Sequence, residues 1–159
     1  MIVEKILQEE LEELRKDLIA KYQELGMRST GEWERGLETE VIHRDGGYSG
    51  VITGLDYTYY MQWGRAEGRM PPVGAILEWI EAKGLRPVEE KMKVSTLAYL
   101  IARKIGREGT RRYQDGGVPA FVDAVITEDR IQRIMDRVGE GCIVRFESEI
   151  IDIIREMVA

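Results

Sequence analysis

Residues 33–48 read WERGLETEVIHRDGGY, and the hydrophobic pattern changes here from helical to alternating. From Trp33 to Ile42, apolar or β-branched side chains at odd positions share one face, and glutamates share the other, as in a half-buried strand. Asp45-Gly46-Gly47 predicts a hairpin turn, because glycine tolerates the positive φ angles that such turns require.

The second strand of this hairpin is expected within Tyr48–Trp63, which is rich in β-branched and aromatic residues. Gly50 and Gly54 suit a bulge or a bend in it. Its end is heavily aromatic, and we expect these rings in the core and at the sheet edge: Tyr57, Tyr59, Tyr60 and Trp63. Residues 32–63 therefore predict a hairpin or small antiparallel sheet.

Upstream, residues 1–25 predict one long amphipathic helix. Its apolar side chains recur in steps of three and four: Val3, Ile6, Leu7, Leu11, Leu14, Leu18, Tyr22 and Leu25. Gly26 suits the left-handed conformation that ends many helices. The stripe can pack on the chain's own sheet or against a neighbouring copy, and the sequence leaves both open.

Two shorter helices are expected downstream, within residues 72–109. Pro71-Pro72 marks the entry of the first, and Gly84 its end. Its apolar stripe is Val73, Ile76, Leu77 and Ile80, with Trp79 beside it. Ser95 or Thr96 can cap the second helix, and Gly109 ends it. The second stripe is Leu97, Leu100, Ile101 and Ile105, with Ala98 and Ala102 allowing close approach.

The chain then predicts a loop or extended arm at 113–121 and a C-terminal helix at 127–157. Gly139 and Gly141 form a soft point in that helix, so two helices remain an alternative to one. These segments together predict a single α+β domain over residues 1–159. In it, a small antiparallel β-sheet is flanked by a long N-terminal helix, two short central helices and a long C-terminal helix.

The composition of the 159 residues excludes several classes of protein. With 43% hydrophobic and 33% charged residues, the chain is typical of a folded protein, and no apolar run is long enough to cross a bilayer. The acidic first residues lack the features of a secretory signal. Cys142 is the single cysteine, which excludes an internal disulfide and fits a reducing compartment. His43 is the single histidine, which excludes sites that need two imidazoles.

The net charge of −6 is unevenly distributed. Residues 83–112 carry nine basic and three acidic side chains, whereas both predicted terminal helices are acidic. Five cations crowd the end of the second central helix: Arg103, Lys104, Arg107, Arg111 and Arg112. They can form a solvated face that complements the helix dipole, or they can meet an acidic partner or a phosphate backbone.

No complete catalytic signature is present, and we expect no enzyme activity, cofactor or metal. Residues 106–110 lack the lysine and spacing of a Walker loop, and residues 47–51 lack the final glycine of a nucleophile elbow. Glu89 and Lys91 match half of a nuclease motif without the preceding carboxylate. Cys142 and His43 are expected as a core thiol and a strand-end imidazole.

One ordered set of segments carries a family resemblance. The segments are YYMQWGRAEGRMPPV at 59–73, ILEWI at 76–80, LAYLIARKI at 97–105, EGT at 108–110 and PAF at 119–121. Together they resemble the tail-component, or tail-completion, family of tailed double-stranded DNA bacteriophages. The likeness covers roughly residues 48–125, and the long N-terminal helix is also similar. Residues 113–118 depart from the commoner form, in which arginine directly precedes the proline.

The resemblance implies a virion structural protein, present in the host cytoplasm during assembly. Copies would form a ring at the phage neck or tail top, joining portal, adaptor or tail-tube proteins, where they can make a passing contact with DNA in the channel and have no membrane contact. The residues expected to contact neighbours are Trp63, Arg65, Arg69, Met70, Arg103, Lys104, Arg107, Arg111, Arg112 and Phe121.

A second hypothesis belongs to a different class. The basic segment 83–112 also fits a small intracellular protein that binds or processes nucleic acid. This hypothesis predicts salt-sensitive DNA binding that falls when the arginines of the segment are neutralised.

Overall fold

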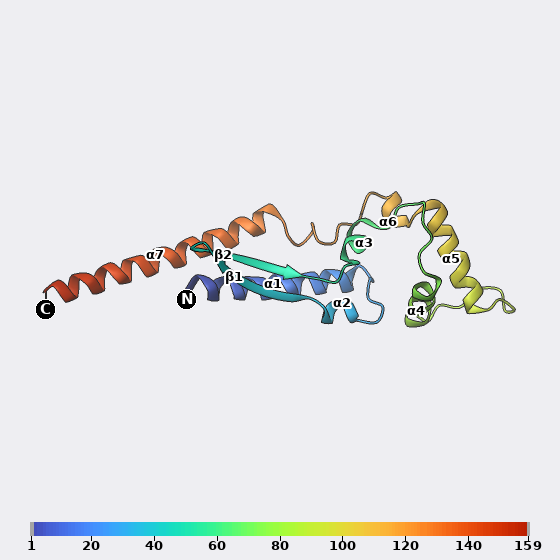
Figure 1. Cartoon of the computed structure of the whole chain (residues 1–159), viewed down its shortest axis with the longest axis horizontal. Helices are drawn as coiled ribbons and strands as arrows, with labels where there is room; N and C mark the ends of the chain where they lie inside the picture. Colours follow the sequence, from blue (N-terminus) through green and yellow to red (C-terminus); the bar gives the residue numbers. More distant parts are fainter. Residues whose placement is uncertain (1, 159) are drawn as a thin grey trace. The chain divides into compact units, whose positions relative to one another are not determined.

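The computed structural model describes residues 2–158 and confirms the α+β class (Figure 1). In chain order the elements are α1 (Ile2–Glu24), α2 (Glu32–Arg35), β1 (Glu38–Arg44), β2 (Gly47–Thr53), α3 (Thr58–Trp63), α4 (Val73–Lys83), α5 (Val94–Glu108), α6 (Arg111–Gln114) and α7 (Glu128–Val158). None of the described helices is both long and apolar enough to span a membrane.

Internal contacts group the chain into two compact units. The first unit holds the chain up to Ala20, the hairpin segment Leu37–Thr53 and the chain from Asp123 onward. The second unit holds Lys21–Gly36 and Gly54–Val122. The central helices α4 and α5 share a unit with α2, α3 and α6, whereas the hairpin belongs to the first unit.

The hairpin of the first unit turns where predicted. Asp45 and Gly46 both have positive φ, 51° and 78°, which suits a two-residue turn between paired strands. The antiparallel register runs without a bulge from Glu38 opposite Thr53 to Arg44 opposite Gly47. The expected bulge at Gly50 is therefore wrong. Gly50 instead makes room for Leu11, whose Cδ2 would lie 3.1 Å from a Cβ there.

Helix α1 packs its stripe on this hairpin, which is the first of the two alternatives. Leu11, Leu14 and Leu18 are buried. At the margin of the contact, Arg15 Nε donates to the Leu37 carbonyl at 2.9 Å, and the Thr39 hydroxyl donates to Glu12 at 2.6 Å. Buried apolar side chains and the polar contacts at their margin therefore hold the hairpin against the apolar stripe of α1.

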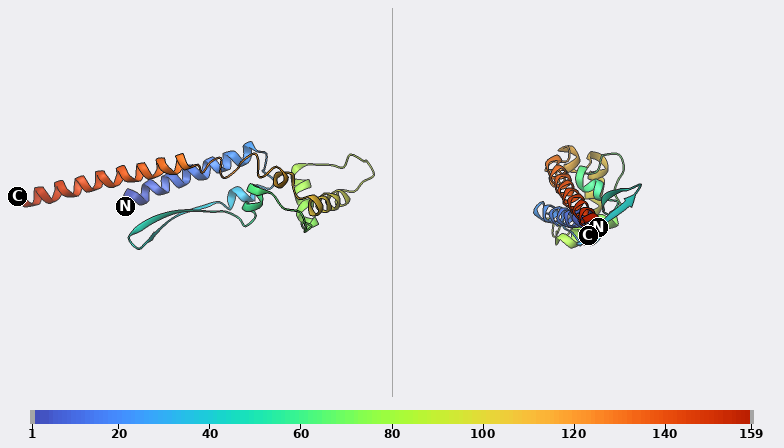
Figure 2. Two further views of the ribbon diagram at one scale, coloured as in Figure 1. Left: turned by 90° about the horizontal axis from the view of Figure 1, so that it is seen from above. Right: turned by 90° about the vertical axis from the view of Figure 1, so that its left-hand side faces the viewer.

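Helix α7 is one continuous helix that runs antiparallel to α1 within the first unit. Arg130 pairs with Asp17 at 3.1 Å, and Arg137 pairs with Glu10 at 2.6 Å. Gly141 is buried, and a Cβ there would lie 2.5 Å from Ile6 Cδ1. Figures 1 and 2 show α7 continuing past the start of α1.

The core of the second unit is built around Trp33, which overturns the predicted strand at residues 33–37. Trp33 lies in the short helix α2, where its ring packs against Tyr22 at 4.8 Å and Phe121 at 5.1 Å between centroids. Its indole Nε1 donates to Thr58 Oγ1 at 2.9 Å. Because Gly31 has φ 75°, the chain enters α2 from a left-handed residue instead of an extended one.

The aromatic end of the predicted second strand is also helical. β2 ends at Thr53, and residues 58–63 form α3. Its buried side chain is polar: Gln62 Oε1 accepts hydrogen bonds from the backbone amides of Phe121 at 3.2 Å and Val122 at 2.7 Å. Tyr59, Tyr60 and Trp63 are exposed instead of forming a core or sheet edge.

Helix α4 has its predicted bounds, and α5 ends before Gly109 as predicted, but Leu100 of the predicted α5 stripe is exposed. Ile80, Ala98 and Ala102 are completely buried, and Gly84 ends α4 in the left-handed conformation. The predicted cap at Ser95 or Thr96 is wrong. α5 begins one residue after Lys93, which makes no side-chain capping bond.

Candidate functional site

The segments that carry the family resemblance meet in the second unit. The Arg65 amide donates to Thr110 Oγ1 at 2.9 Å, and the Thr110 amide donates to the Arg65 carbonyl at 2.8 Å. The Gly68 amide donates to the Gly106 carbonyl at 2.8 Å. The loop after α3 is thus fixed to the end of α5, and we call this contact the interlock.

Glycines let the two backbones of the interlock approach each other. A Cβ on Gly64, whose φ is 79°, would lie 2.4 Å from the Tyr113 amide nitrogen. A Cβ on Gly109, whose φ is 74°, would lie 2.8 Å from the Arg65 carbonyl. Because both contacts are to backbone atoms, a side chain at either position would force the loop away from α5.

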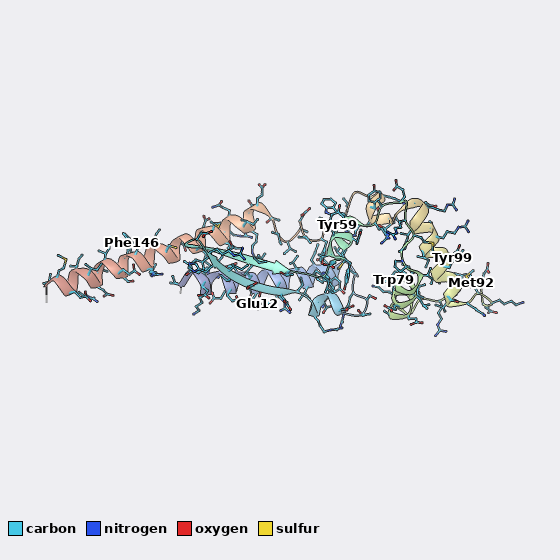
Figure 3. All side chains as sticks on the ribbon, in the orientation of Figure 1. Glu12, Tyr59, Trp79, Met92, Tyr99 and Phe146 are labelled. Atoms are coloured by element: carbon cyan, nitrogen blue, oxygen red, sulfur yellow. The ribbon has the colours of Figure 1, made fainter. Side chains whose placement is uncertain are left out.

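An aromatic patch lies beside the interlock. Tyr59, Tyr60, Trp63 and Tyr113 are all exposed, and with Gly64, Ala66 and Gly116 they line a pocket of about 320 Å³. The Arg65 guanidinium lies 5.7 Å from the Tyr60 ring centroid. Such exposed rings beside a cation are typical of protein contact surfaces. Figure 3 labels Tyr59 on α3.

A larger groove of about 760 Å³ lies between α4, α5 and α6. Trp79, Ile101 and Ile105 provide its apolar lining, and Lys104 and Arg111 lie among its polar residues. Their side chains are 74% and 93% exposed.

The remaining predicted cations have different environments. Arg112 is half-buried, and its Nη1 donates to the carbonyls of Gly117 at 3.4 Å and Pro119 at 2.6 Å, so it holds the loop in place. Arg103 and Arg107 are exposed on α5, and no ion pair or hydrogen bond involves their side chains within residues 2–158. Arg69 and Met70 are exposed on the loop before α4.

Phe121 is the one predicted contact residue that the structure places in the core. It is completely buried against Trp33, and its amide is bound by Gln62. A neighbouring chain cannot reach it without opening the second unit. We therefore remove Phe121 from the candidate contacts.

The end of α7 is a surface that sequence reasoning missed. From Cys142 to Val158, which we call the α7 tail, every described residue is exposed. Nine large apolar side chains are 40–83% exposed: Ile143, Val144, Phe146, Ile150, Ile151, Ile153, Ile154, Met157 and Val158. Figure 3 labels Phe146. Helical spacing identifies these residues as one apolar face, but it carries no signal that the face is uncovered.

The residues considered for chemistry are dispersed. His43 is exposed at the end of β1 and stacks on Tyr48 at 4.7 Å, as a strand-end imidazole. Cys142 is exposed, so the expected core thiol is wrong. Residues 2–158 contain no group of three metal-binding side chains, and Glu89 and Lys91 are exposed between helices.

Shifts in pKa follow packing and ion pairs. Burial raises the pKa of Tyr22 and Tyr57. The hydrogen bonds that Arg137 donates to the Glu10 and Glu9 carboxylates raise the pKa of its guanidinium. Tyr22 lies in the core, Tyr57 is partly exposed, and Arg137 lies at the contact between α1 and α7; none of them lines either cavity described above.

Comparison with known proteins gave no match to a family model, a curated protein or a solved structure. The functional argument therefore uses the surfaces of this chain: the aromatic patch, the groove and the α7 tail. All three are suited to binding another macromolecule, because they combine exposed apolar side chains with charged margins.

Proposed function

We propose that this chain is a non-enzymatic structural subunit of a tailed bacteriophage. Copies form a ring at the neck or tail top and join head or portal components to the tail. The observation that supports this most is the presence of different exposed apolar surfaces on the two compact units: the α7 tail on the first, and the aromatic patch with the groove on the second.

A closed ring of identical subunits needs two unlike, complementary surfaces on each copy. Monomeric proteins rarely expose continuous apolar patches beyond a few hundred Å². The interlock gives further support, since it joins Gly64-Arg65 to Gly109-Thr110, two of the segments on which the family resemblance rests. A loop held in this way presents Arg69 and Met70 to a neighbour with little entropic cost.

The test is the composition of the assembled particle. Quantitative mass spectrometry of virions purified from the phage that encodes this chain should find it in multiple copies, in fixed ratio to the portal protein. Electron microscopy of the neck should then show density for a ring of this fold. If the protein is absent from mature virions, the proposal is wrong.

Nucleic-acid binding remains the second candidate because Arg103 and Arg107 are exposed without partners among the described residues. DNA binding measured at increasing salt should weaken steeply, and Arg103→Gln with Arg107→Gln should reduce the salt slope by about two. The matched control is Arg155→Gln on the α7 tail, which should leave the slope unchanged. If no binding is detected at low salt, this candidate is excluded.

A further inference from the structure

The α7 tail exposes a large apolar surface. Nine large apolar side chains at 40–83% exposure amount to several hundred Å². This is of the same order as the roughly 800 Å² that one partner contributes to a stable protein interface. The tail therefore needs a partner surface of substantial size.

The apolar face of the tail points away from α1. The first part of α7 approaches α1 at Gly141, where a Cβ would lie 2.5 Å from Ile6 Cδ1, and Ile134 and Val138 on the same side of α7 are half-buried. Ile150 follows Gly141 by nine residues, which at 3.6 residues per turn places it about 180° around the helix. A longer α1 would thus meet the polar side of the tail, where Arg145 pairs with Glu149 at 2.7 Å.

The apolar face is also too wide for one partner helix. Viewed down the helix axis at 3.6 residues per turn, the apolar side chains of the tail cover an arc of about 200°, with Cys142 at one edge and Val144 at the other. A core-facing stripe covers only about 100°. Glu147 is the one charged side chain within that arc. A helix with such a face is best covered by a groove whose walls come from more than one element.

The chain itself carries a groove of this kind. Trp79 comes from one wall, α4, and Ile101 and Ile105 come from the other, α5. Two exposed cations are available at its margin, because Lys104 and Arg111 make only long ion pairs, 4.0 Å to Glu108 and 3.6 Å to Asp115. Figure 3 labels Trp79, which lines this groove, and Phe146 on the tail.

The tail and the segment that supplies most of the groove have opposite net charges, and the groove lining itself is balanced, with Lys104 and Arg111 beside Glu108 and Asp115. The tail carries two basic and four acidic side chains, and residues 83–112 carry nine basic and three acidic ones. Pairing two tails would bring like charges together, whereas placing a tail on the groove brings Glu147 toward Lys104 and Arg111.

We infer that the α7 tail of one copy docks in the groove between α4, α5 and α6 of a second copy. This inference deepens the proposed ring and rests on it for its biological setting. The contact joins unlike surfaces, so each copy offers a tail and receives one. Repetition of the contact closes a ring if the rotation per subunit permits it.

Cross-linking between two different variants tests this contact. In a Cys142→Ser background, which removes the only native thiol, one chain carries Val144→Cys on the tail and the other carries Gln114→Cys in the groove. A short bis-maleimide should give cross-linked dimers in the equimolar mixture at concentrations up to about 1 mM, and none with either variant alone.

Other results overturn the inference. Dimers from Val144→Cys alone would show that tails pair with tails. An internally cross-linked monomer from a chain carrying both cysteines would show that the tail occupies its own groove. The absence of any cross-link in the mixture would show that the two surfaces do not meet.

A matched pair of variants separates docking from folding. Ile150→Asp adds a charge to the apolar face and should reduce cross-linking by at least tenfold, whereas Ser148→Asp adds the same charge to the polar face and should leave it unchanged. Both positions are exposed, so both variants should retain the wild-type circular dichroism spectrum. Equal loss in both variants would contradict the inference.

The outcomes for this contact and for the proposed function are distinguishable. A virion ring that uses other surfaces would overturn the contact and leave the proposed function intact. A tail-to-groove cross-link in a protein that is absent from virions would support the contact and overturn the proposed function.

Discussion

Helices α1 and α7 carry apolar side chains at similar helical spacing, but only α1 has its stripe covered within the chain. Leu11, Leu14 and Leu18 are buried beneath the hairpin, whereas Phe146 and Ile153 on α7 are more than half exposed. Gly141 is the one buried residue among those described in α7, and every described residue after it is exposed. Periodicity identifies which side chains share a face, and the length and direction of neighbouring elements decide whether that face is covered.

The largest expected difference is in stability. Leu18→Ala should lower the free energy of unfolding by about 2–5 kcal/mol, because it leaves a cavity at a side chain that is 3% exposed. Ile153→Ala, at 56% exposure, should change it by less than about 0.5 kcal/mol. Urea unfolding at low protein concentration measures both. Equal losses would show that the tail is packed within the monomer.

Two glycines in α7 should respond differently to alanine. Gly139 has open space around its Cα, so Gly139→Ala should stabilise the helix by about 0.5–1 kcal/mol through helix propensity. Gly141→Ala should lose that gain, because its Cβ would meet Ile6 Cδ1 at 2.5 Å and the Ile6 side chain must shift. Thermal unfolding of the two variants compares them directly. Equal gains would indicate that α1 does not approach Gly141.

A smaller effect is expected from the ion pairs that join the two helices. Arg137→Gln removes contacts to both Glu9 and Glu10 and should lower the urea midpoint more at low salt than at high salt. Arg155→Gln is the control, since its 3.5 Å pair with Asp152 lies within the exposed tail. A salt-independent loss at Arg137 would indicate packing by its aliphatic stem instead.

The smallest predicted effect is an alkaline one at the end of the α1 stripe. Burial raises the pKa of Tyr22 above its ordinary value of 10.0, so the unfolded chain loses this proton first. The associated stability is present below pH 10 and is lost as the pH rises above it. Tyr22→Phe should flatten this part of the pH profile of the urea midpoint. If the slope of the urea midpoint against pH is unchanged, the effect comes from Tyr57, whose pKa is also raised by burial.

Local rules predicted the four longer helices and the turn correctly, but they missed the short helices α2, α3 and α6. The stripes of α1, α4 and α5 and the Asp45-Gly46 turn follow from spacing and glycine conformation. Trp33 lies in a single helical turn because Tyr22 and Phe121 pack on it, and four residues are too few for periodicity to distinguish strand from helix.

The candidate site shows the same division. The loop cations and Trp63 lie where another molecule can reach them, but Phe121 does not, because the buried Gln62 side chain binds its amide from α3. That hydrogen bond joins residues 59 positions apart, which no local pattern records. The exposure of the α7 tail was equally unpredictable, since it depends on which side of α7 faces α1 at Gly141 and on the turn of α7 beyond that residue.

The interlock has a mechanical consequence. Gly109 and Thr110 line the groove, Gly64 and Tyr113 line the aromatic pocket, and the bonds between Arg65 and Thr110 join them, so the two cavities share a wall. A molecule that binds in one cavity and displaces this shared wall changes the affinity of the other cavity for its own ligand. Thermodynamic reciprocity makes that influence equal in both directions. In the proposed ring, binding of one neighbour at the groove and of another at the aromatic patch would therefore be coupled through the interlock.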